Sequence, residues 1–498
     1  MNRSRKSGVN KAWWGILGFV AGLIVVFFGI QFITQTGIFA KPGVVVYDES
    51  LNESEIARLS EIFTEEVVLK KDVTISARNE LILSELGENE FLYSVSLPVV
   101  DFYSSEENII VDSADELFTN CLDCTYKMID VDDLNFNQKL LKINGRYYLD
   151  DFESGAVFRI LEFTSEKYEE EIKPLVDGKF VAGFSSSDVL TLAQTGVTAF
   201  SRLVNAKMNE VGSSEYFAEG LVGFLPKYDF VHTSNEASFS YSAPTSGATG
   251  TPICSDWRFG ETLKTIGVNI VELTGNHNLD CGDDDAIATL NYYHDNEILT
   301  VGGGATASEA AVPLEIDGKG TNITMLAYNL STGGATYGDT PGANQYYEEN
   351  AVAEINSAKT RGDFVIVDIQ YYECSAYASE YEDPICDYAG SSVGNQIGFF
   401  RHLIDLGADV VVGTSAHQPQ TFELYGDGVI YYGLGNLFFD QYRWPGTTRS
   451  LILVHHFYKD RLLQTEVVPT VYDANFQTRL MDDETRAWYL ARLISERP

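Results

Sequence analysis

The amino-acid sequence predicts an α/β protein in three parts: an N-terminal transmembrane helix, a small α/β module and a larger layered α/β domain. Three observations indicate this organisation. Residues 13–33 form one uninterrupted apolar run. Apolar segments of strand length alternate with helical segments, most regularly after residue 188, and such alternation is typical of layered α/β folds. With 45 % hydrophobic and 12 % aromatic residues, the 498-residue chain also has enough apolar material for folded cores.

The apolar run follows a basic tail, residues 1–12, and has the ~20 residues that cross a ~30 Å hydrocarbon layer. Two tryptophans open the run, four basic residues precede it, and the first charge after it is Lys41. We therefore expect a single-pass protein of the cell membrane, anchored in the bilayer through residues 13–33. Its N-terminus would be cytoplasmic and the bulk of the chain extracytoplasmic. A cleaved signal peptide is the alternative, but residues 38–40 fit a cleavage site badly.

Residues 43–184 are predicted to form the small α/β module. Apolar runs at 44–47, 92–102 and 156–163 have strand length, and residues 53–63 carry apolar positions at helical spacing. The module contains no glycine-rich phosphate loop, nucleophile elbow or histidine metal motif. Two roles stay open for it: binding a ligand, or holding the next domain away from the membrane.

A polar stretch at residues 185–188 marks the start of the larger domain, predicted to span residues 188–472. Its expected strands are 189–193, 268–273, 364–369, 410–412, 451–457 and 463–471, and its expected helices are 284–295 and 396–406. Residues 473–498 form a C-terminal segment with a helix at 484–495. In open α/β folds ligands bind at the carboxyl ends of the strands, so residues that follow these strands are the first candidates for a site.

The chain is strongly acidic, with 34 Lys and Arg against 72 Asp and Glu and a formal net charge of −38. Residues 1–40 contain four basic and no acidic residues, so the remainder carries −42. Nucleic acid is excluded as a partner, because its backbone is bound by clustered cationic side chains. Tight electrostatic binding of any other polyanion meets the same repulsion.

Six cysteines occur in the part of the chain expected outside the cytoplasm, where disulfides form. Cys374 and Cys386 would close a short loop, and Cys121 and Cys124 a very tight one. Six cysteines allow 15 connectivities, so the sequence leaves the pairing open.

Two stretches place reactive side chains directly after predicted strands. Residues 271–282 read VELTGNHNLDCG and put Asn276 and His277 at a strand end. Residues 407–420 read GADVVVGTSAHQPQ, with His417 in the loop, and are followed by VIYYGLGNLFFD at 429–440. An amide oxygen and an imidazole side by side can hold a metal ion and donate a proton.

These two stretches resemble the motifs of the CapA family of poly-γ-glutamate capsule proteins, a branch of the calcineurin-like metallophosphoesterases. The family segments read A-N-N-H-x-x-D-x-G and G-A-D-V-V-x-G-H-H-P-H, the latter followed by Y-S-L-G-N-F-x-F-D. Between them, residues 301–304 are similar to the end of the family's G-I-x-x-x-G-x-G segment. The resemblance covers roughly residues 188–445. It implies a four-layer α/β sandwich of the metallophosphoesterase type and a role in capsule or cell-surface polymer synthesis, with the polymer or polymer-synthase subunits as partners.

The resemblance also implies a metal site, but several ligand positions are substituted here. The family's first strand ends G-D-x-x-x-x-R, whereas residues 196–202 read GVTAFSR, with Val197 in place of the aspartate. The histidine of the family's H-W-G segment falls on Gln370, and one histidine of its G-H-H-P-H loop falls on Ser415. Valine cannot coordinate a metal, and an amide or a hydroxyl is a weak replacement for imidazole.

The candidate site residues follow from this comparison. The retained metal ligands are Glu236, Asn276 and His417, and the catalytic general acid would be His277. Further candidates, as weak ligands or substrate contacts, are Gln370, Ser415, Asn436 and Asp280. We expect at most one divalent metal, Mn, Zn or Mg, with none as the alternative, because a two-metal site needs a fuller ligand set.

Two structural alternatives accompany these assignments. His277 could hold its loop through a hydrogen bond to Asp280 without taking part in chemistry. His232 lies four residues before Glu236 on an apolar strand and is interpreted as a hydrogen-bonded core histidine rather than a ligand.

Two functions therefore remain open. One is a metal-dependent hydrolase or transferase of surface-polymer synthesis, and the other is a catalytically depleted scaffold or polymer-binding protein of the cell envelope. The charge of −42 suits a neutral glycan or a protein partner better than polyglutamate, so the sequence leaves the substrate open.

Overall fold

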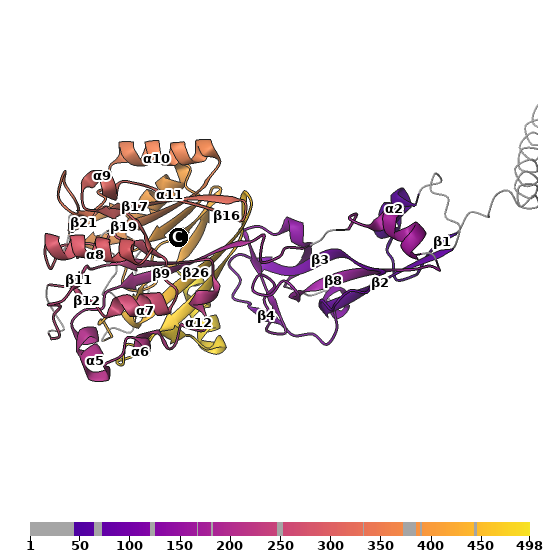
Figure 1. Ribbon diagram of the computed structural model, residues 1–498, viewed down its shortest axis with the longest axis horizontal. Helices are drawn as coiled ribbons and strands as arrows, with labels where there is room; N and C mark the ends of the chain where they lie inside the picture. Colours follow the sequence, from indigo (N-terminus) through magenta and orange to yellow (C-terminus); the bar gives the residue numbers. More distant parts are fainter. Residues whose placement is uncertain are drawn as a thin grey trace, which may run out of the picture. The chain divides into compact units, whose positions relative to one another are not determined.

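The fold is described from a computed structural model of the chain (Figure 1). The structure describes residues 44–63, 72–119, 125–166, 168–180, 183–246, 252–331, 333–371, 385–388, 391–442 and 446–498. They form two compact units: the first holds described residues up to Ser96, at Ser113–Asp115 and from Val157 to Phe180, and the second holds the remainder. Residues of the predicted module 43–184 occur in both units.

The described part of the first unit is a small sheet with two helices. In spatial order it contains β1 (Val45–Tyr47), β2 (Val73–Ile82) and most of β8 (Ser154–Thr164) and β3 (Glu90–Asp101), and its helices are α2 (Glu53–Ile62) and α4 (Lys173–Val176). Helix α2 begins at a reciprocal cap, in which Asn52 Oδ1 accepts from the backbone N–H of Glu55 at 2.9 Å and Glu55 Oε2 accepts from that of Asn52 at 2.8 Å. Leu59 of α2 packs with Val73 and Phe163 in the core of this unit.

Two large sheets form the second unit. The first sheet has the order β14 (Leu299–Val301), β13 (Ile270–Glu272), β10 (Phe230–Asn235), β9 (Leu190–Thr198), β26 (Arg449–Tyr458), β27 (Arg461–Val471) and β28 (Arg479–Leu480), with β25 (Asn436–Phe438) beside β9. The second sheet has the order β16 (Leu314–Gly318), β17 (Thr321–Asn329), β19 (Phe364–Gln370), β22 (Val410–Gly413), β24 (Gly428–Tyr431) and β23 (Phe422–Tyr425). Strands β9, β10, β13 and β14 are parallel, as are β17, β19, β22 and β24.

Helices cover the outer faces of the two sheets (Figure 1). Those with residues in the outer core of the first sheet are α5 (Leu203–Val211), α6 (Glu215–Ala218), α7 (Phe259–Thr265) and α8 (Asp283–Asp295). Those with residues in the outer core of the second sheet are α10 (Glu348–Arg361) and α11 (Gln396–Asp405). The C-terminal helix α12 (Asp483–Ser495) contributes Tyr489 and Leu493 to the central core.

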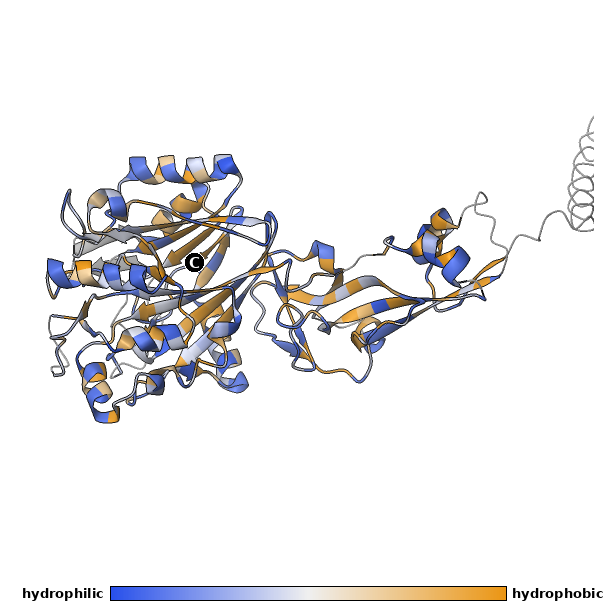
Figure 2. Cartoon of the chain, in the orientation of Figure 1, coloured by the Kyte–Doolittle hydropathy of each residue, from blue (hydrophilic) through white to orange (hydrophobic). Residues whose placement is uncertain are grey.

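Alternation along the strands sorts side chains into these layers, since successive residues of a strand face opposite sides. In β26, Ile452 and Val454 pack toward the helices while Leu451 and Leu453 join the core between the sheets. In β19, Ile366 lies in that central core and Val367 in the outer one. Both faces of the strands are therefore apolar along much of their length, as the hydropathy colouring shows (Figure 2). The layers are helices, sheet, sheet and helices, as the family resemblance implied.

The expected strands and helices are present, with ends shifted by a few residues. Helix α12 begins one residue before the predicted 484–495, and α8 begins one residue before 284–295. Strand β17, nine residues long and paired between β16 and β19, was not predicted. The predicted transmembrane segment, residues 13–33, lies outside the described residues. Among the residues that are described, no helix has both the length and the apolar character needed to cross a bilayer.

The interior between the sheets changes from apolar to polar toward the carboxyl ends of the parallel strands. Gln194 of β9 donates its amide N–H to Asp368 Oδ1 of β19 at 3.1 Å, and His232 Nε2 of β10 lies 3.2 Å from Asp368 Oδ2. All three side chains are fully buried. We call Gln194, His232 and Asp368 the polar seam, because they join one sheet to the other. His232 is a core residue as predicted, but neither of its ring nitrogens has a hydrogen-bond partner among the described residues, so the predicted hydrogen bond is absent.

The seam extends further into the first sheet through His455 of β26. The amide oxygen of Gln194 lies 2.9 Å from His455 Nε2, and His455 Nδ1 lies 2.8 Å from the Thr465 hydroxyl. Because Gln194 donates to Asp368, its oxygen accepts from His455, which places the ring proton on Nε2. Burial lowers the pKa of His455 to about 3, so this histidine is neutral at neutral pH.

We expect Asp368→Ala to lower the free energy of unfolding by about 3 kcal/mol or more, because it removes the acceptor of the buried Gln194 amide and the carboxylate beside His232. Urea unfolding of the full chain measures this change. Asp317→Ala is the matched control, since Asp317 is an exposed residue of β16. Equal losses in the two variants would contradict a structural role for the seam.

Candidate functional site

The candidate residues lie at or just beyond the carboxyl ends of parallel strands from both sheets. Glu236 follows β10, Asn276 and His277 follow β13, Gln370 ends β19, and His417 follows β22. The seam residues lie earlier on the strands of the two sheets. Asp368 precedes Gln370 by two positions on β19 and faces the same side, and His232 precedes Glu236 by four positions. The seam thus forms the floor beneath the strand-end residues.

Close backbone contact holds the β13 loop against Glu236. A Cβ added at Gly275 would lie 2.6 Å from both the Cα and the carbonyl oxygen of Glu236, which only glycine avoids. Beside this contact, Ala237 and His277 form an isolated parallel bridge, and the N–H of Glu236 donates to the Thr198 carbonyl at 2.9 Å. Glu236, with 1 % exposure, and Asn276 are therefore brought together at one edge of the sandwich.

A hydrogen bond between two amide side chains joins the sheets at the site. Gln370 Nε2 donates to Asn276 Oδ1 at 3.0 Å. Gln370 is buried, and among the described residues its own Oε1 has no hydrogen-bond partner. We call Asn276 and Gln370 the amide pair. It presents neutral donors and acceptors where the resemblance implied an imidazole next to an amide.

Buried His417 is oriented by Asn436 of β25. The Asn436 amide donates to Gln441 Oε1 and to the Thr447 carbonyl, both at 3.1 Å, so its Oδ1 faces His417 Nδ1 at 2.9 Å. His417 must donate from Nδ1, and Nε2 then carries the lone pair of the ring. Asn436, predicted as a weak ligand or substrate contact, has the geometry of a residue that orients His417.

His277 is paired with Asp280 and is partly accessible. His277 Nδ1 lies 2.8 Å from Asp280 Oδ2, and the side chain is 14 % exposed. The same carboxylate oxygen accepts from the N–H of Ile253 at 2.8 Å. A carboxylate fixed in this way orients the ring and favours a proton on Nδ1. The predicted His277–Asp280 hydrogen bond is present, while the catalytic role of His277 stays a prediction.

The disulfide closest to the site was not among the pairs singled out from the sequence. Cys254 is bonded to Cys281, one residue after Asp280, with a Cα–Cα distance of 6.2 Å. Together with the Ile253–Asp280 hydrogen bond, it ties the loop of His277 to the segment before α7. Residues 121, 124 and 374 lie outside the described part of the chain.

An apolar cluster surrounds Val197, which replaces the aspartate implied by the resemblance. Val197 is 1 % exposed and packs with Ala199, Ala237, Ile253 and Phe439. The ring of Phe439 also lies 5.0 Å from that of His417. The apolar cluster thus adjoins Glu236 through Ala237 and His417 through Phe439, so the environment is apolar where a charged ligand would stand.

Two further interactions position the site and were missed in the sequence. Arg202, just after β9, donates from Nε to Asp440 Oδ2 at 2.9 Å, which joins the first and last motifs. Asn329, at the end of β17, donates to the Thr274 carbonyl at 2.7 Å and holds the start of the β13 loop. Arg202 ends the motif at residues 196–202 and Asp440 ends the motif at 429–440. Because they are 238 positions apart, the sequence does not reveal their contact.

The residues at the implied metal-ligand positions do not fit a two-metal centre. One aspartate position holds buried Val197, two histidine positions hold Gln370 and Ser415, and an amide N–H of Gln370 faces the Asn276 oxygen that a cation would need. No group of three or more His, Cys, Asp or Glu within the described ranges is arranged to hold a metal ion. A single weak metal on Glu236, Asn276 and His417 stays a prediction.

Fold and site define an α/β sandwich protein with a polar site at the carboxyl ends of strands from both sheets. Residues 191–441 match the family described as Bacterial capsule synthesis protein PGA_cap. The chain belongs to this family, as the CapA resemblance indicated.

Named relatives are similar to part of the chain. The PGA biosynthesis protein CapA of Bacillus subtilis is 28 % identical over 212 residues, which are 42 % of this chain and 52 % of the relative. The capsule biosynthesis protein CapA of Bacillus anthracis is 24 % identical over 218 residues, 42 % of this chain and 50 % of the relative. A "Probable polyglutamine synthesis accessory protein" of Mycobacterium tuberculosis is 26 % identical over 201 residues, 38 % of this chain and 49 % of the relative. The chain spans about half the length of the curated relatives it matches.

We expect reduction of the Cys254–Cys281 bond to lower the free energy of unfolding by about 3.5 kcal/mol, the value for a closed loop of this length. Urea unfolding of the full chain with and without dithiothreitol measures the loss. The double variant Cys254→Ala/Cys281→Ala should unfold at the lower stability under both conditions. A reductant effect of the same size in that variant would place the stabilising disulfide elsewhere.

Proposed function

We propose that this protein is an accessory factor of cell-envelope polymer synthesis that binds the polymer at the strand-end site rather than cleaving it with two metal ions. It would be anchored in the membrane through residues 13–33, with the sandwich outside the cell and the polymer-synthase subunits as partners. The observation that carries the proposal is that the residues in place of the family's metal ligands fit their new neighbours. Val197 is buried among apolar neighbours, and Gln370 forms a hydrogen bond with Asn276 in place of binding a cation.

The groups that the site offers suit a polymer with amide or hydroxyl groups. Amide side chains donate and accept at once, so the amide pair can match a peptide-type linkage on both its N–H and its carbonyl. The Gln370 Oε1 acceptor, which has no hydrogen-bond partner among the described residues, leaves one such position to be filled. A buried acceptor gains most from a ligand donor, since leaving it unsatisfied is costly.

The names of the relatives support poly-γ-glutamate as the type of polymer that is bound, whereas the charge of the chain opposes it. Outside residues 1–40 the chain carries −42, so a polyanion is repelled at long range. Contact through the neutral amide pair is local and does not depend on charge attraction. Binding should therefore strengthen as added salt screens the repulsion.

A second function, hydrolysis, is favoured by one observation. The His277–Asp280 contact is the arrangement of an oriented general acid, with a ring that is partly accessible at the strand end. A hydrolase would use His277 to protonate the leaving group of the cleaved bond.

The binding experiment uses a γ-linked glutamate oligomer and the purified full chain in isothermal titration calorimetry. We expect Gln370→Ala to weaken binding by about five- to tenfold, the effect of one lost hydrogen bond in a buried site. Gln477→Ala is the matched control, because the Gln477 amide donates to the carbonyl of Tyr216 in α6 and to the carboxylate of Glu219 just after it, away from the site. Affinity should rise between 20 and 150 mM salt. Equal affinity of Gln370→Ala and wild type, or affinity that falls with salt, would contradict the proposal.

The hydrolysis experiment follows polymer length by gel electrophoresis after incubation with the same protein. The binding proposal predicts unchanged length for wild type and for His277→Ala. Shortening by wild type that His277→Ala abolishes would establish the second function instead.

A further inference from the structure

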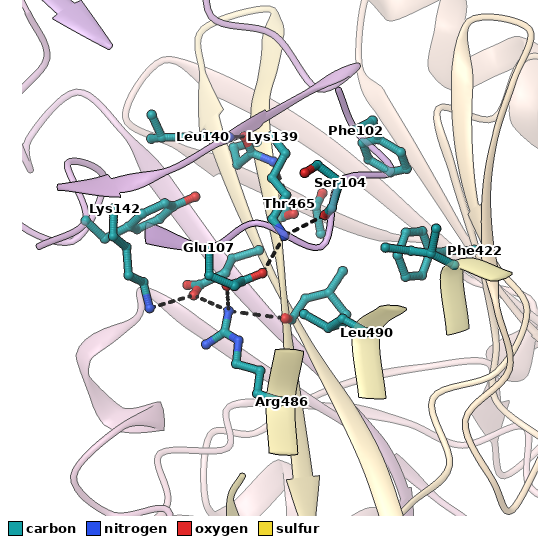
Figure 3. A pocket seen from close by; sticks show the side chains of 15 residues that line it. Phe102, Ser104, Glu107, Lys139, Leu140, Lys142, Phe422, Thr465, Arg486 and Leu490 are labelled. Atoms are coloured by element: carbon teal, nitrogen blue, oxygen red, sulfur yellow. Dashed lines mark hydrogen bonds and ion pairs between the residues drawn. The ribbon is translucent and has the colours of Figure 1, made fainter. Parts of the chain in front are cut away.

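A pocket lies in the larger unit, and it is separate from the strand-end residues. It is formed by the segment around β6 (Gln138–Leu140) and β7 (Lys142–Ile143) together with β27 and α12 (Figure 3). Its volume is about 40 Å³, which accommodates about three waters or one carboxylate group, and the pocket is partly open, so a longer ligand can extend beyond this volume. None of the candidate site residues lines it.

One side of this pocket is charged. Arg486 Nη2 lies 3.0 Å from Glu107 Oε2 and 2.9 Å from Glu466 Oε1, and Lys139 pairs with Glu107. Lys142 Nζ approaches Glu466 only to 3.7 Å, beyond hydrogen-bond distance. Three cations therefore face two carboxylates, in a protein whose formal net charge is −38.

The charge states support a positive surplus in this pocket. Burial alone would raise the pKa of Glu466, but Arg486 and Lys142 lower it to about 2, so both salt-bridge partners are charged at neutral pH. Burial lowers the pKa of Lys139, which its contact with Glu107 opposes. The neighbouring pair Lys227 and Asp150, 2.9 Å apart, adds one charge of each sign and leaves the surplus unchanged.

Several donors of the pocket have no acceptor among the described residues. Arg486 Nε is buried without a hydrogen-bond partner, and Lys142 makes only the long contact to Glu466. Tyr147, which is only 6 % exposed, also lines the pocket. Burial and nearby carboxylates raise the pKa of Tyr147 well above its ordinary value, so the hydroxyl keeps its proton and remains a donor. Unfilled donors in a buried, positively charged pocket call for an anionic acceptor.

The other side of the pocket is apolar. Phe102, Phe422 and Leu490 lie opposite the charged groups (Figure 3). The rings of Phe102 and Phe422 meet edge to face, with centroids 5.7 Å apart. A ligand that fills both sides has a charged head and a short aliphatic segment.

We propose that this pocket binds a short aliphatic carboxylate, with its carboxylate between Lys142, Tyr147 and Arg486 and its methylene groups against Phe102, Phe422 and Leu490. The carboxylate balances the surplus cation and accepts from the unfilled donors. Two sources share this chemistry: a free short-chain acid and a pendant carboxylate of a γ-linked glutamate chain. The inference stands independently of the proposed function, because no residue of the strand-end site takes part.

Isothermal titration calorimetry of the full chain with sodium butyrate tests this proposal, with 1-butanol as the uncharged ligand of matched length. We expect saturable binding of butyrate and none of butanol. Tyr147→Phe removes only the hydroxyl and keeps the ring that contacts His456, and Lys142→Gln removes the least buried cation. Each variant should weaken butyrate binding by about tenfold. The matched controls are Tyr337→Phe and Lys264→Gln, which lie outside the pocket and should bind as wild type does.

A γ-glutamyl trimer in place of butyrate distinguishes the two sources. Tighter binding of the trimer that Lys142→Gln weakens assigns the pocket to a polymer carboxylate, and tighter binding of butyrate assigns it to a free acid. The proposal is overturned if neither compound binds saturably, if butanol binds as tightly as butyrate, or if both pocket variants bind as the controls do. Circular dichroism of each variant establishes that the fold is intact before the comparison.

Discussion

The contact of Asp368 with Gln194 and His232 is the constraint on which the candidate site depends. Asp368 lies on one sheet and its two partners on the other, and all three are buried between them. A buried carboxylate is tolerated only with such partners, so the sheets have little freedom to slide past each other. Gln370, two residues further along β19, is thereby placed within 3.0 Å of Asn276 from the opposite sheet. The seam thus sets the register of the strand ends that carry the site.

The residues around the seam explain how the substituted side chains are accommodated. Glu272 is buried beside it, and burial together with Asp368 raises the pKa of Glu272. Its carboxylate accepts from the N–H of Thr274, where the loop leading to Asn276 begins. Val197, the amide pair and the Asn436–His417 contact are each accommodated by neighbours of matching polarity. Apolar groups surround the valine and an amide meets an amide, while the buried carboxylate of Glu236 remains at the site.

Much of this arrangement was predictable from the sequence, for identifiable reasons. Alternating apolar and helical segments predicted the layers, because both sheets bury strands on two faces. The position of reactive side chains directly after strands predicted the site. His277 and Asp280 are close enough in sequence for their contact to be expected. Strand β17 was missed because its apolar run, between the recognised motifs, carries no residue of their patterns. The amide pair joins residues that are 94 positions apart in the sequence. The hydrogen bond between the substituted Gln370 and the retained Asn276 therefore could not be deduced without the fold. The carboxylate pocket joins residues more than 300 positions apart, as in the bond from Leu140 to Gln464.

The central claim is that the substituted residues no longer support two bound metal ions. Elemental analysis of the full chain tests it most directly, after equilibration with excess Mn²⁺ and removal of unbound ions by gel filtration. The triple variant Val197→Asp/Gln370→His/Ser415→His, which restores the family's ligand types, serves as the comparison. At most one ion per wild-type chain is expected, together with a higher content in the triple variant. Two tightly bound ions per wild-type chain would contradict the account.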